Sequence, residues 1–420
     1  MKKIAILVFF TVGFFVHVWA CTGLIAGKQA TVDGSVLVTY SADSHTLYGA
    51  LTSSPAADWP KGSMRSIVEW DTNKPLGEIE QVEHTYAVIG NMNEHQLTVV
   101  ESTWGGRPEL VDTTGIIDYG SLMQLALERA KTAREAIKVM TGLVKKYGYY
   151  SSGESFTIAD PNEAWILDLI GKGPGRRGAV WVAVRIPDDC IAGHANYPRI
   201  HKIPMDDKEN CLYSPDVISF AREMGYFDGL NKDFSFARAY SPADFGALRA
   251  CDARVWSFFR KYDSTMDNYL PYVNGESAEP FPLYVKPSRK LSVQDMKEAM
   301  RDHFEDTPFD MTQDVGAGPF KVPYRFRPMS FEVDGKSYCM ERAIATQQTG
   351  FTLVGQMRNW LPDPVGGVLW FGVDDANTCV YIPMYCGITQ VPECFSPENG
   401  SMYDFSWTSA FWIHNWAVSY

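Results

Sequence analysis

The chain has 420 residues, long enough for a large buried core, and its 38 Lys and Arg against 50 Asp and Glu give a formal net charge of −12 at pH 7. An acidic chain without a basic cluster is poorly suited to bind nucleic acid or anionic membrane surfaces, so we exclude both classes of partner. No long linker, repeat or low-complexity stretch divides the sequence.

Residues 1–20 have the pattern of an export signal. Lys2 and Lys3 precede an apolar run at residues 4–16, and Val18-Trp19-Ala20 has the form of a cleavage site. The apolar run is too short to span a membrane. We therefore expect residues 1–20 to be removed, and the mature protein to act in the periplasm or outside the cell.

Cleavage after Ala20 makes Cys21 the first residue of the mature chain. Such a cysteine carries a nucleophilic thiol and, in its α-amine, a base with an ordinary pKa of about 7.7–8.0. Two other interpretations stay open here. Bacterial lipoproteins are acylated at an N-terminal cysteine, and a secreted protein can also begin with cysteine by chance. Against the lipoprotein, Trp19 is large for that cleavage site and no flexible tether follows Cys21.

The next residues predict a β-hairpin with two strands, at residues 22–30 and 35–40. Asp33-Gly34 between them supplies the positive φ angles of a tight turn. A tight turn places Cys21 opposite about Thr46, which makes Asp43 the nearest carboxylate able to hold the α-ammonium of Cys21. A plain strand end is the alternative role for Asp43.

Strands dominate the first half of the chain, with a helical block inserted, which predicts sheets covered by helices. The predicted helices are two at residues 119–147, broken near Lys131-Thr132, and shorter ones at 215–224 and 293–304, the last capped by Ser292. The predicted strands are a strand-turn-strand unit at 86–103, three strands at 155–159, 163–170 and 179–185, and strand character over 360–384.

Several common functional motifs are absent from the sequence. There is no G-x-S-x-G elbow and no H-E-x-x-H motif, and nothing near a histidine marks a papain-like site. The 8 cysteines include no C-x-x-C pair, and Cys379, Cys386 and Cys394 lack the spacing of a zinc site. We predict no metal and no cofactor, and the pairing of the cysteines stays open.

Taken together, the motifs resemble those of one enzyme family. The chain resembles the cysteine-nucleophile dipeptidase family (dipeptidase A and secernin-like), within the N-terminal nucleophile hydrolases that also include bile-salt hydrolases and penicillin V acylases. The resemblance covers most of the mature chain, best over residues 21–204. The segments that carry it are Cys21-Thr22, residues 32–35, Asp43-Ser44, residues 91–95, Glu101-Ser102-Thr103, residues 160–165, residues 181–188 and His194-Ala195-Asn196.

This resemblance implies an α+β fold, a four-layer αββα sandwich formed by residues 21–420 as a single catalytic domain. It also implies amide hydrolysis through an acyl-enzyme on Cys21. Asp43 resembles the carboxylate that orients the N-terminal amine, and Asn196 resembles the side chain that donates to the oxyanion. Arg254 resembles a late arginine whose charge lowers the pKa of the thiol.

Two positions depart from the family pattern. Tyr40 stands where relatives commonly carry an arginine, which changes the electrostatics near the nucleophile. Thr103 stands where distant acylases place a second oxyanion asparagine, so a hydroxyl or backbone N–H takes that place. We assign substrate binding to Tyr40, Asn93 and Thr103.

The sequence thus predicts an exported cysteine-type dipeptidase that hydrolyses short peptides, with the α-amine of Cys21 as general base. One alternative is an acylase of a non-peptide amide, such as a conjugated bile acid. The alternative from another class is a lipid-anchored binding protein acylated at Cys21. The expected partner is a short peptide substrate, with no stable membrane span, and a homo-oligomer stays open.

Overall fold

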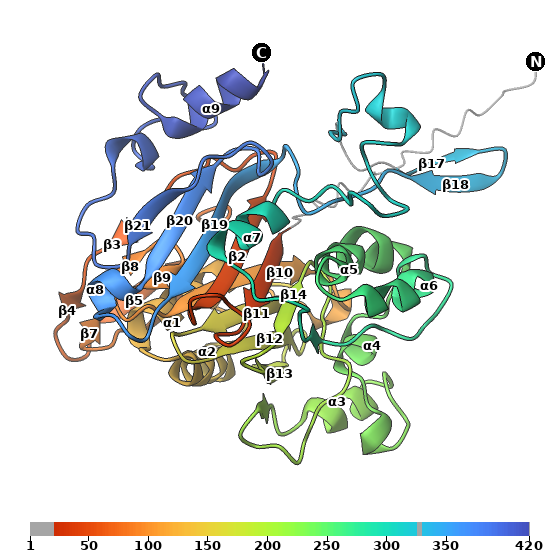
Figure 1. Ribbon diagram of the computed structural model, residues 1–420. Helices are drawn as coiled ribbons and strands as arrows, with labels where there is room; N and C mark the ends of the chain where they lie inside the picture. Colours follow the sequence, from red (N-terminus) through yellow and green to blue (C-terminus); the bar gives the residue numbers. More distant parts are fainter. Residues whose placement is uncertain (1–20, 326–329, 420) are drawn as a thin grey trace, which may run out of the picture.

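The computed structural model describes residues 21–325 and 330–419, so the predicted signal peptide at residues 1–20 lies outside the described residues. Two antiparallel sheets form the centre of the molecule (Figure 1). The seven-stranded sheet has the order β16 (Tyr284–Val285), β14 (Ile191–His194), β1 (Thr22–Ala26), β2 (Val36–Asp43), β19 (Thr349–Met357), β20 (Val368–Val373) and β21 (Ile382–Tyr385). The eight-stranded sheet has the order β15 (Cys211–Tyr213), β13 (Ala179–Ile186), β12 (Ala164–Gly171), β11 (Gly153–Ala159), β10 (Thr98–Trp104), β9 (Met92–Asn93), β8 (Val88–Ile89) and β3 (Ser53–Ser54).

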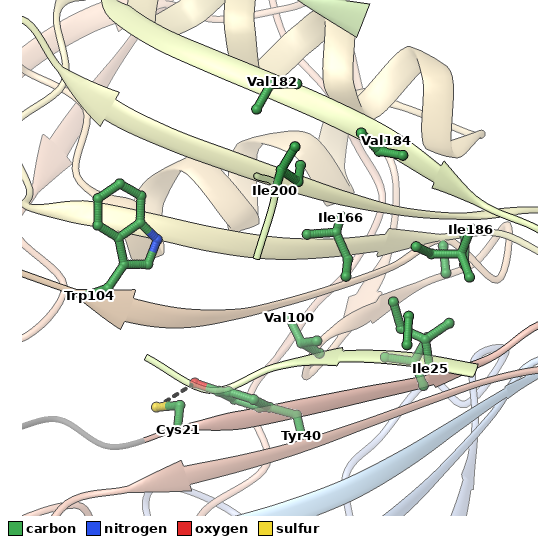
Figure 2. Close-up of a cluster of buried hydrophobic side chains, with 14 of the residues drawn as sticks. Cys21, Ile25, Tyr40, Val100, Trp104, Ile166, Val182, Val184, Ile186 and Ile200 are labelled. Atoms are coloured by element: carbon green, nitrogen blue, oxygen red, sulfur yellow. Dashed lines mark hydrogen bonds between the residues drawn. The ribbon is translucent and has the colours of Figure 1, made fainter. Parts of the chain in front are cut away.

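The two sheets pack face to face over a core of inward-facing side chains. Every residue of β11 and β12 is buried, as near-continuous apolar strands between two packed layers require. Figure 2 shows the two strand layers meeting over this core. The buried cluster includes Ile25, Val38, Val100, Ile166 and Val182.

One pair of helices covers the outer face of the eight-stranded sheet: α1 (Tyr119–Arg129) and α2 (Ala133–Tyr147). The predicted break is confirmed, because the Thr132 side chain caps α2 by accepting from the backbone N–H of Glu135. The apolar faces of the two helices form one buried cluster with β10, β11 and β12, to which Leu125, Ile137, Phe156 and Trp165 belong.

A second helical layer covers the outer face of the seven-stranded sheet. Here α5 (Ala253–Arg260) and α7 (Val293–Ala299) share a cluster with β1, which includes Leu24, Phe259 and Met296. The layers therefore run helix, sheet, sheet, helix, which confirms the predicted αββα sandwich. The other helices are α3 (Val217–Glu223), α4 (Phe236–Tyr240), α6 (Leu270–Val273), α8 (Asp363–Gly366) and α9 (Ala410–Ser419).

Smaller two-stranded units lie outside the two main sheets. They pair β4 (Ala57–Asp58) with β7 (His84–Thr85), β5 (Met64–Val68) with β6 (Pro75–Glu80), and β17 (Ser330–Val333) with β18 (Lys336–Cys339). All eight cysteines are free thiols. Among the described residues, no helix has the length and apolar character needed to cross a membrane.

The predicted hairpin forms, but its register is wrong. Gly23 pairs with Tyr40, so Cys21 does not lie opposite Thr46. The reason is that the chain leaves β1 after Ala26 and turns toward the start of β14, where the backbone N–H of Gly27 donates to the carbonyl oxygen of Cys190 at 3.0 Å. The connection is therefore longer than a tight turn, and β2 continues to Asp43 at the level of Cys21.

Two further predicted elements are shorter than expected. The predicted helix at 293–304 ends at Ala299, although Ser292 caps it with a full capping box as expected. The stretch 360–384 is not continuous strand, because Pro362 and Pro364 begin the short helix α8 before β20.

Candidate active site

The thiol of Cys21 lines a cavity of about 540 Å³. Cys21 directly precedes β1 and is 2% exposed. The neighbouring strand β2 contributes Tyr40 and Asp43 to the wall, and helix α1 contributes Tyr119. The volume is within the usual range of small-molecule sites. The other lining residues are Ala42, Thr46, Leu47, Ala50, Thr52, Glu69, Trp70, Asp71, Thr72, Gly90, Asn91, Glu101, Gly120, Met123, Gln124, Leu127, Phe351 and Phe371.

The thiol is held in its neutral form by its surroundings. Burial raises the pKa of Cys21 above its usual value, and the negative charges of Glu101 and Asp43 raise it further. The hydroxyl of Tyr40, 3.6 Å from the sulfur, opposes this by donating to it (Figure 2). The thiol therefore needs a base before it can attack a carbonyl.

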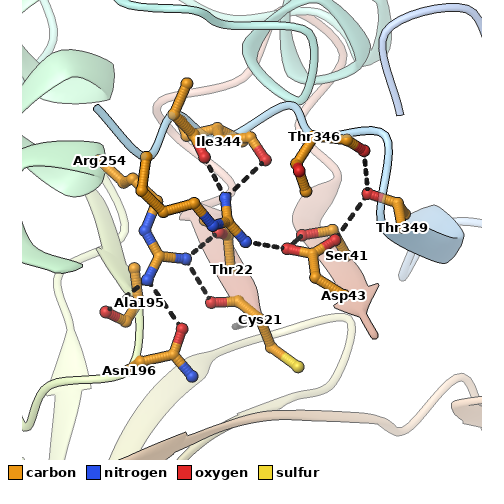
Figure 3. Close-up of polar contacts among 12 residues, drawn as sticks. Cys21, Thr22, Ser41, Asp43, Ala195, Asn196, Arg254, Ile344, Thr346 and Thr349 are labelled. Atoms are coloured by element: carbon orange, nitrogen blue, oxygen red, sulfur yellow. Dashed lines mark hydrogen bonds and ion pairs between the residues drawn. The ribbon is translucent and has the colours of Figure 1, made fainter. Parts of the chain in front are cut away.

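Asp43, expected near Cys21, lies there and is paired with a cation that no sequence pattern predicted. The Arg342 guanidinium donates to Oδ2 of Asp43 at 2.5 Å, and both side chains are buried. The hydroxyl of Thr349 donates to Oδ1 at 2.6 Å (Figure 3). The segment at residues 342–349, far along the chain from β2, thus fixes this carboxylate beside Cys21.

Arg254, on α5, holds the backbone of the nucleophile. Its guanidinium donates to the carbonyl oxygen of Cys21 and to the hydroxyl of Thr22, both at 2.8 Å, and to Oδ1 of Asn196 at 2.7 Å (Figure 3). Burial lowers the pKa of Arg254 to about 10, so it stays charged at neutral pH. Arg254 thus contacts the backbone of Cys21, the Thr22 hydroxyl and Asn196, and the effect of its charge on the pKa of the thiol stays a prediction.

Asn196 is oriented by three separate contacts. Besides the bond from Arg254, its Nδ2 donates to the carbonyl oxygen of Thr103 at 2.6 Å, and its backbone N–H donates to Ser102 Oγ at 3.2 Å. Its φ of 56° is in the left-handed region, which asparagine tolerates better than most residues. Figure 3 shows its side chain on the same side of the network as the Cys21 thiol, as an oxyanion donor requires.

Thr103, predicted to bind substrate, does not line the cavity. Its hydroxyl has a single proton, which it donates to Oε1 of Glu154 at 2.7 Å. It lies outside the set of residues that line the cavity. The neighbouring Glu101 lies there instead, with Oε1 accepting from the Tyr40 hydroxyl at 2.5 Å. Tyr40 therefore lies where the substrate-binding assignment placed it, whereas Thr103 supports the wall from behind.

Asn93, like Thr103, Asn196 and Arg254, lies outside the cavity lining. Its Nδ2 donates to the carbonyl oxygens of Leu127 and Ala130 at 2.7 and 2.8 Å. Its Oδ1 accepts from the backbone N–H groups of His95 and Leu97. All its hydrogen-bonding capacity thus joins the turn before β10 to the end of α1, which is a structural role.

We expect Asn93→Ala to destabilise the protein by about 2–3 kcal/mol, because it leaves buried backbone groups without partners. The KM for peptide should not change. Thermal unfolding and steady-state kinetics of the same preparation check both statements. A raised KM with unchanged stability would return Asn93 to the substrate site.

No histidine replaces the base that the thiol needs. Among the residues described, those lining the cavity include no histidine. His194 is the last residue of β14, the strand that pairs with β1. It hydrogen-bonds Ser102 through Nδ1 and Thr157 through Nε2. Burial, together with nearby arginines, lowers its pKa to about 3, so it stays neutral and fully engaged.

The arrangement is a buried thiol with a charge-neutralised carboxylate on one side and an oriented amide on the other. Sequence reasoning missed Arg342 and Thr349, and it quoted Glu101 without giving it a role. Arg342 lies in an irregular segment after β18, where no periodicity or motif marks it. A signal for Glu101 was present, because a charged residue in the middle of the apolar strand β10 is costly unless it has a function.

Comparison with known proteins places this site in a family. The pattern of Peptidase family C69 matches residues 20–419. The chain is 27% identical over 396 residues to a protein named probable dipeptidase from Salmonella dublin, covering 88% of this chain and 81% of that protein. It is 25% identical to a probable dipeptidase of Latilactobacillus sakei, covering 94% of this chain and 79% of the relative. It is 24% identical to dipeptidase A of Lactobacillus helveticus, covering 94% and 80%. Since the family match spans nearly its whole length, the chain belongs to Peptidase family C69 and is a peptidase.

Proposed function

We propose that the protein is an exported dipeptidase that uses Cys21 as nucleophile and the α-amine of Cys21 as general base. The observation that carries this proposal is the thiol in the cavity without a histidine or lysine among the described lining residues. A free α-amine on the same residue supplies the missing base. Asp43, held by Arg342, is placed to orient that amine.

In the proposed reaction, the α-amine takes the thiol proton and the sulfur attacks the peptide carbonyl carbon. Asn196 stabilises the oxyanion of the tetrahedral intermediate. The C–N bond then breaks, the leaving amine takes the proton back, and a thioester remains on Cys21. Water, deprotonated by the same α-amine, hydrolyses the thioester and restores the enzyme.

Two observations favour short peptides over the alternative functions. The enclosed cavity carries Asp43, Glu69, Asp71 and Glu101, and no lysine or arginine occurs among its described lining residues. Such a lining suits a substrate with an ammonium group and repels an anionic bile-acid conjugate. A lipid anchor needs Cys21 at the surface, whereas Cys21 is 2% exposed between the two sheets.

The N-terminus provides the test. Protein that begins at Cys21 should hydrolyse dipeptides, whereas protein with one additional residue before Cys21 should be inactive, because the basic amine has become a neutral amide. Intact mass must show that each form has the stated N-terminus and carries no acyl chain. Equal turnover by the extended form would show that another base acts, and acyl chains on Cys21 of protein from the native host would support the anchor.

A further inference from the structure

Two glutamates are buried behind the nucleophile without a cation. Glu101, on β10, is 2% exposed, and Glu154, on the adjacent strand β11, is fully buried. Among the described residues neither forms a salt bridge, in contrast to Asp43 with Arg342. Tyr40 donates to Glu101 and Thr103 donates to Glu154, and the two carboxyls also hydrogen-bond each other. The second oxygen of Glu154 is buried with no partner.

Glu101 and Glu154 have no neutralising cation among the described residues. Burial raises the pKa of Glu101, and burial together with the charge of Glu101 raises the pKa of Glu154. The two carboxyls therefore tend to retain a proton that each would release in water. A bound cation would take the place of that proton. Glu101 is the member of the pair that lines the cavity, so a ligand can reach it.

Glu101 is also close to the reacting sulfur. The Tyr40 hydroxyl contacts both groups, at 3.6 Å from Sγ of Cys21 and 2.5 Å from Oε1 of Glu101. The Glu101 carboxyl also hydrogen-bonds the Cys21 thiol directly. Tyr40, on β2, and Glu101, on β10, are thus both in contact with the thiol.

The geometry of a dipeptide requires an ammonium group at this place. In a dipeptide attacked at its peptide bond, the α-nitrogen lies about 2.5 Å from the carbonyl carbon. The sulfur approaches that carbon to about 3–3.5 Å before bond formation. The ammonium must therefore bind a group immediately around Cys21. Asp43 is engaged by Arg342 and, in the proposed function, by the α-amine of Cys21, which leaves Glu101 as the cavity carboxylate in contact with the Tyr40–Cys21 pair.

We propose that Glu101, oriented by Tyr40, binds the α-ammonium of the substrate and so restricts the enzyme to peptides with a free N-terminus. This inference rests on the proposed dipeptidase function and adds the group that selects the substrate. In the bound state, Glu101 is ionised and accepts from both the Tyr40 hydroxyl and the ammonium. The proton displaced from the glutamate pair leaves to solvent.

The subsite has a pH dependence of defined sign. As the pH falls through the raised pKa of Glu101, the carboxyl becomes neutral, ammonium binding weakens and KM rises. Above about pH 8 the substrate amine loses its own charge and KM rises again. The titratable groups that face Glu101 are Cys21, Tyr40, Glu154 and, from the α1 side, Tyr119, whose hydroxyl donates to Asp71 at 2.9 Å.

The test compares a dipeptide with its N-acetyl form in mature wild-type protein and in Glu101→Gln. We expect wild type to favour the free amine in kcat/KM, and Glu101→Gln to lose about 10- to 100-fold on the free dipeptide alone, chiefly through KM. Glu128→Gln removes another buried carboxylate, outside the cavity, and should keep the wild-type preference. Glu101→Asp keeps the charge and should retain part of the preference, which also covers the case that Glu101→Gln does not fold.

The outcomes separate this inference from the function on which it rests. Wild type that hydrolyses dipeptides and their N-acetyl forms equally well overturns the ammonium subsite alone, as does an unchanged preference in Glu101→Gln. Wild type that hydrolyses no dipeptide overturns the proposed function, and the subsite with it. A rate of Cys21 alkylation that is similar in Glu101→Gln and wild type assigns the loss to substrate binding and supports the inference. A loss that is equal for both substrates contradicts it.

Discussion

Cys21→Ser should reduce peptide hydrolysis by at least about 10³-fold and leave the fold intact. A serine hydroxyl is far harder to deprotonate than a thiol, and the α-amine is too weak a base to ionise it. Sγ hydrogen-bonds the Tyr40 hydroxyl at 3.6 Å, the backbone of Asp43 and the Glu101 carboxyl, and a serine hydroxyl can take part in the same bonds. Stability should therefore change little.

The measurement is the rate of dipeptide hydrolysis with a thermal melt of the same sample. Cys394→Ser is the matched control, because Cys394 is a partly buried thiol outside the cavity lining. It should keep wild-type activity. Substantial turnover by Cys21→Ser would show that the nucleophile lies elsewhere.

The second large effect is expected for Asp43→Asn, in activity and in stability together. Loss of the charge that orients the α-amine should lower kcat by about 10²–10⁴-fold. The substitution also leaves the buried Arg342 guanidinium without its counter-ion, and breaking a buried ion pair on one side costs about 3–5 kcal/mol. From sequence alone Asp43→Asn is expected to lower activity far more than stability, because asparagine can still occupy a strand end. Arg342 changes that expectation.

The double variant Asp43→Asn with Arg342→Met separates the two effects. Removing the uncompensated cation should recover much of the lost stability, because a buried pair can be replaced by apolar side chains at little cost. Activity should stay low, since the orienting charge is still missing. Recovery of activity along with stability would show that Asp43 acts only through the fold.

The layers of the fold were predictable where the pattern is local. The pair α1 and α2 has helical spacing and a threonine cap, and the strands β11 to β13 are separated by clear turn residues. The strand β19 was not predicted, although it lies at the centre of a sheet beside β2. It comes after a long irregular stretch, and its position depends on pairing with residues some 300 positions earlier.

The candidate site shows the same division. Cys21, Asp43 and Asn196 lie on or next to regular strands and belong to motifs that can be recognised in one dimension. Arg342 is defined only by what it meets in space, so no pattern around it carries the information. The predicted register of β1 with β2 was wrong for a related reason. The backbone N–H of Gly27 bonds to Cys190, which is distant in sequence, rather than to the paired strand of the hairpin.

The contacts of Asp43 determine when the enzyme can become active during its synthesis. This carboxylate is bound by residues 299 and 306 positions further along the chain. A growing polypeptide that has emerged as far as β13 contains the nucleophile and most of one sheet, but neither of these partners. Contacts of such sequence separation form late and slowly. Under the proposed mechanism, a nascent or truncated chain that lacks residues 342–349 therefore carries a Cys21 whose base is not yet oriented.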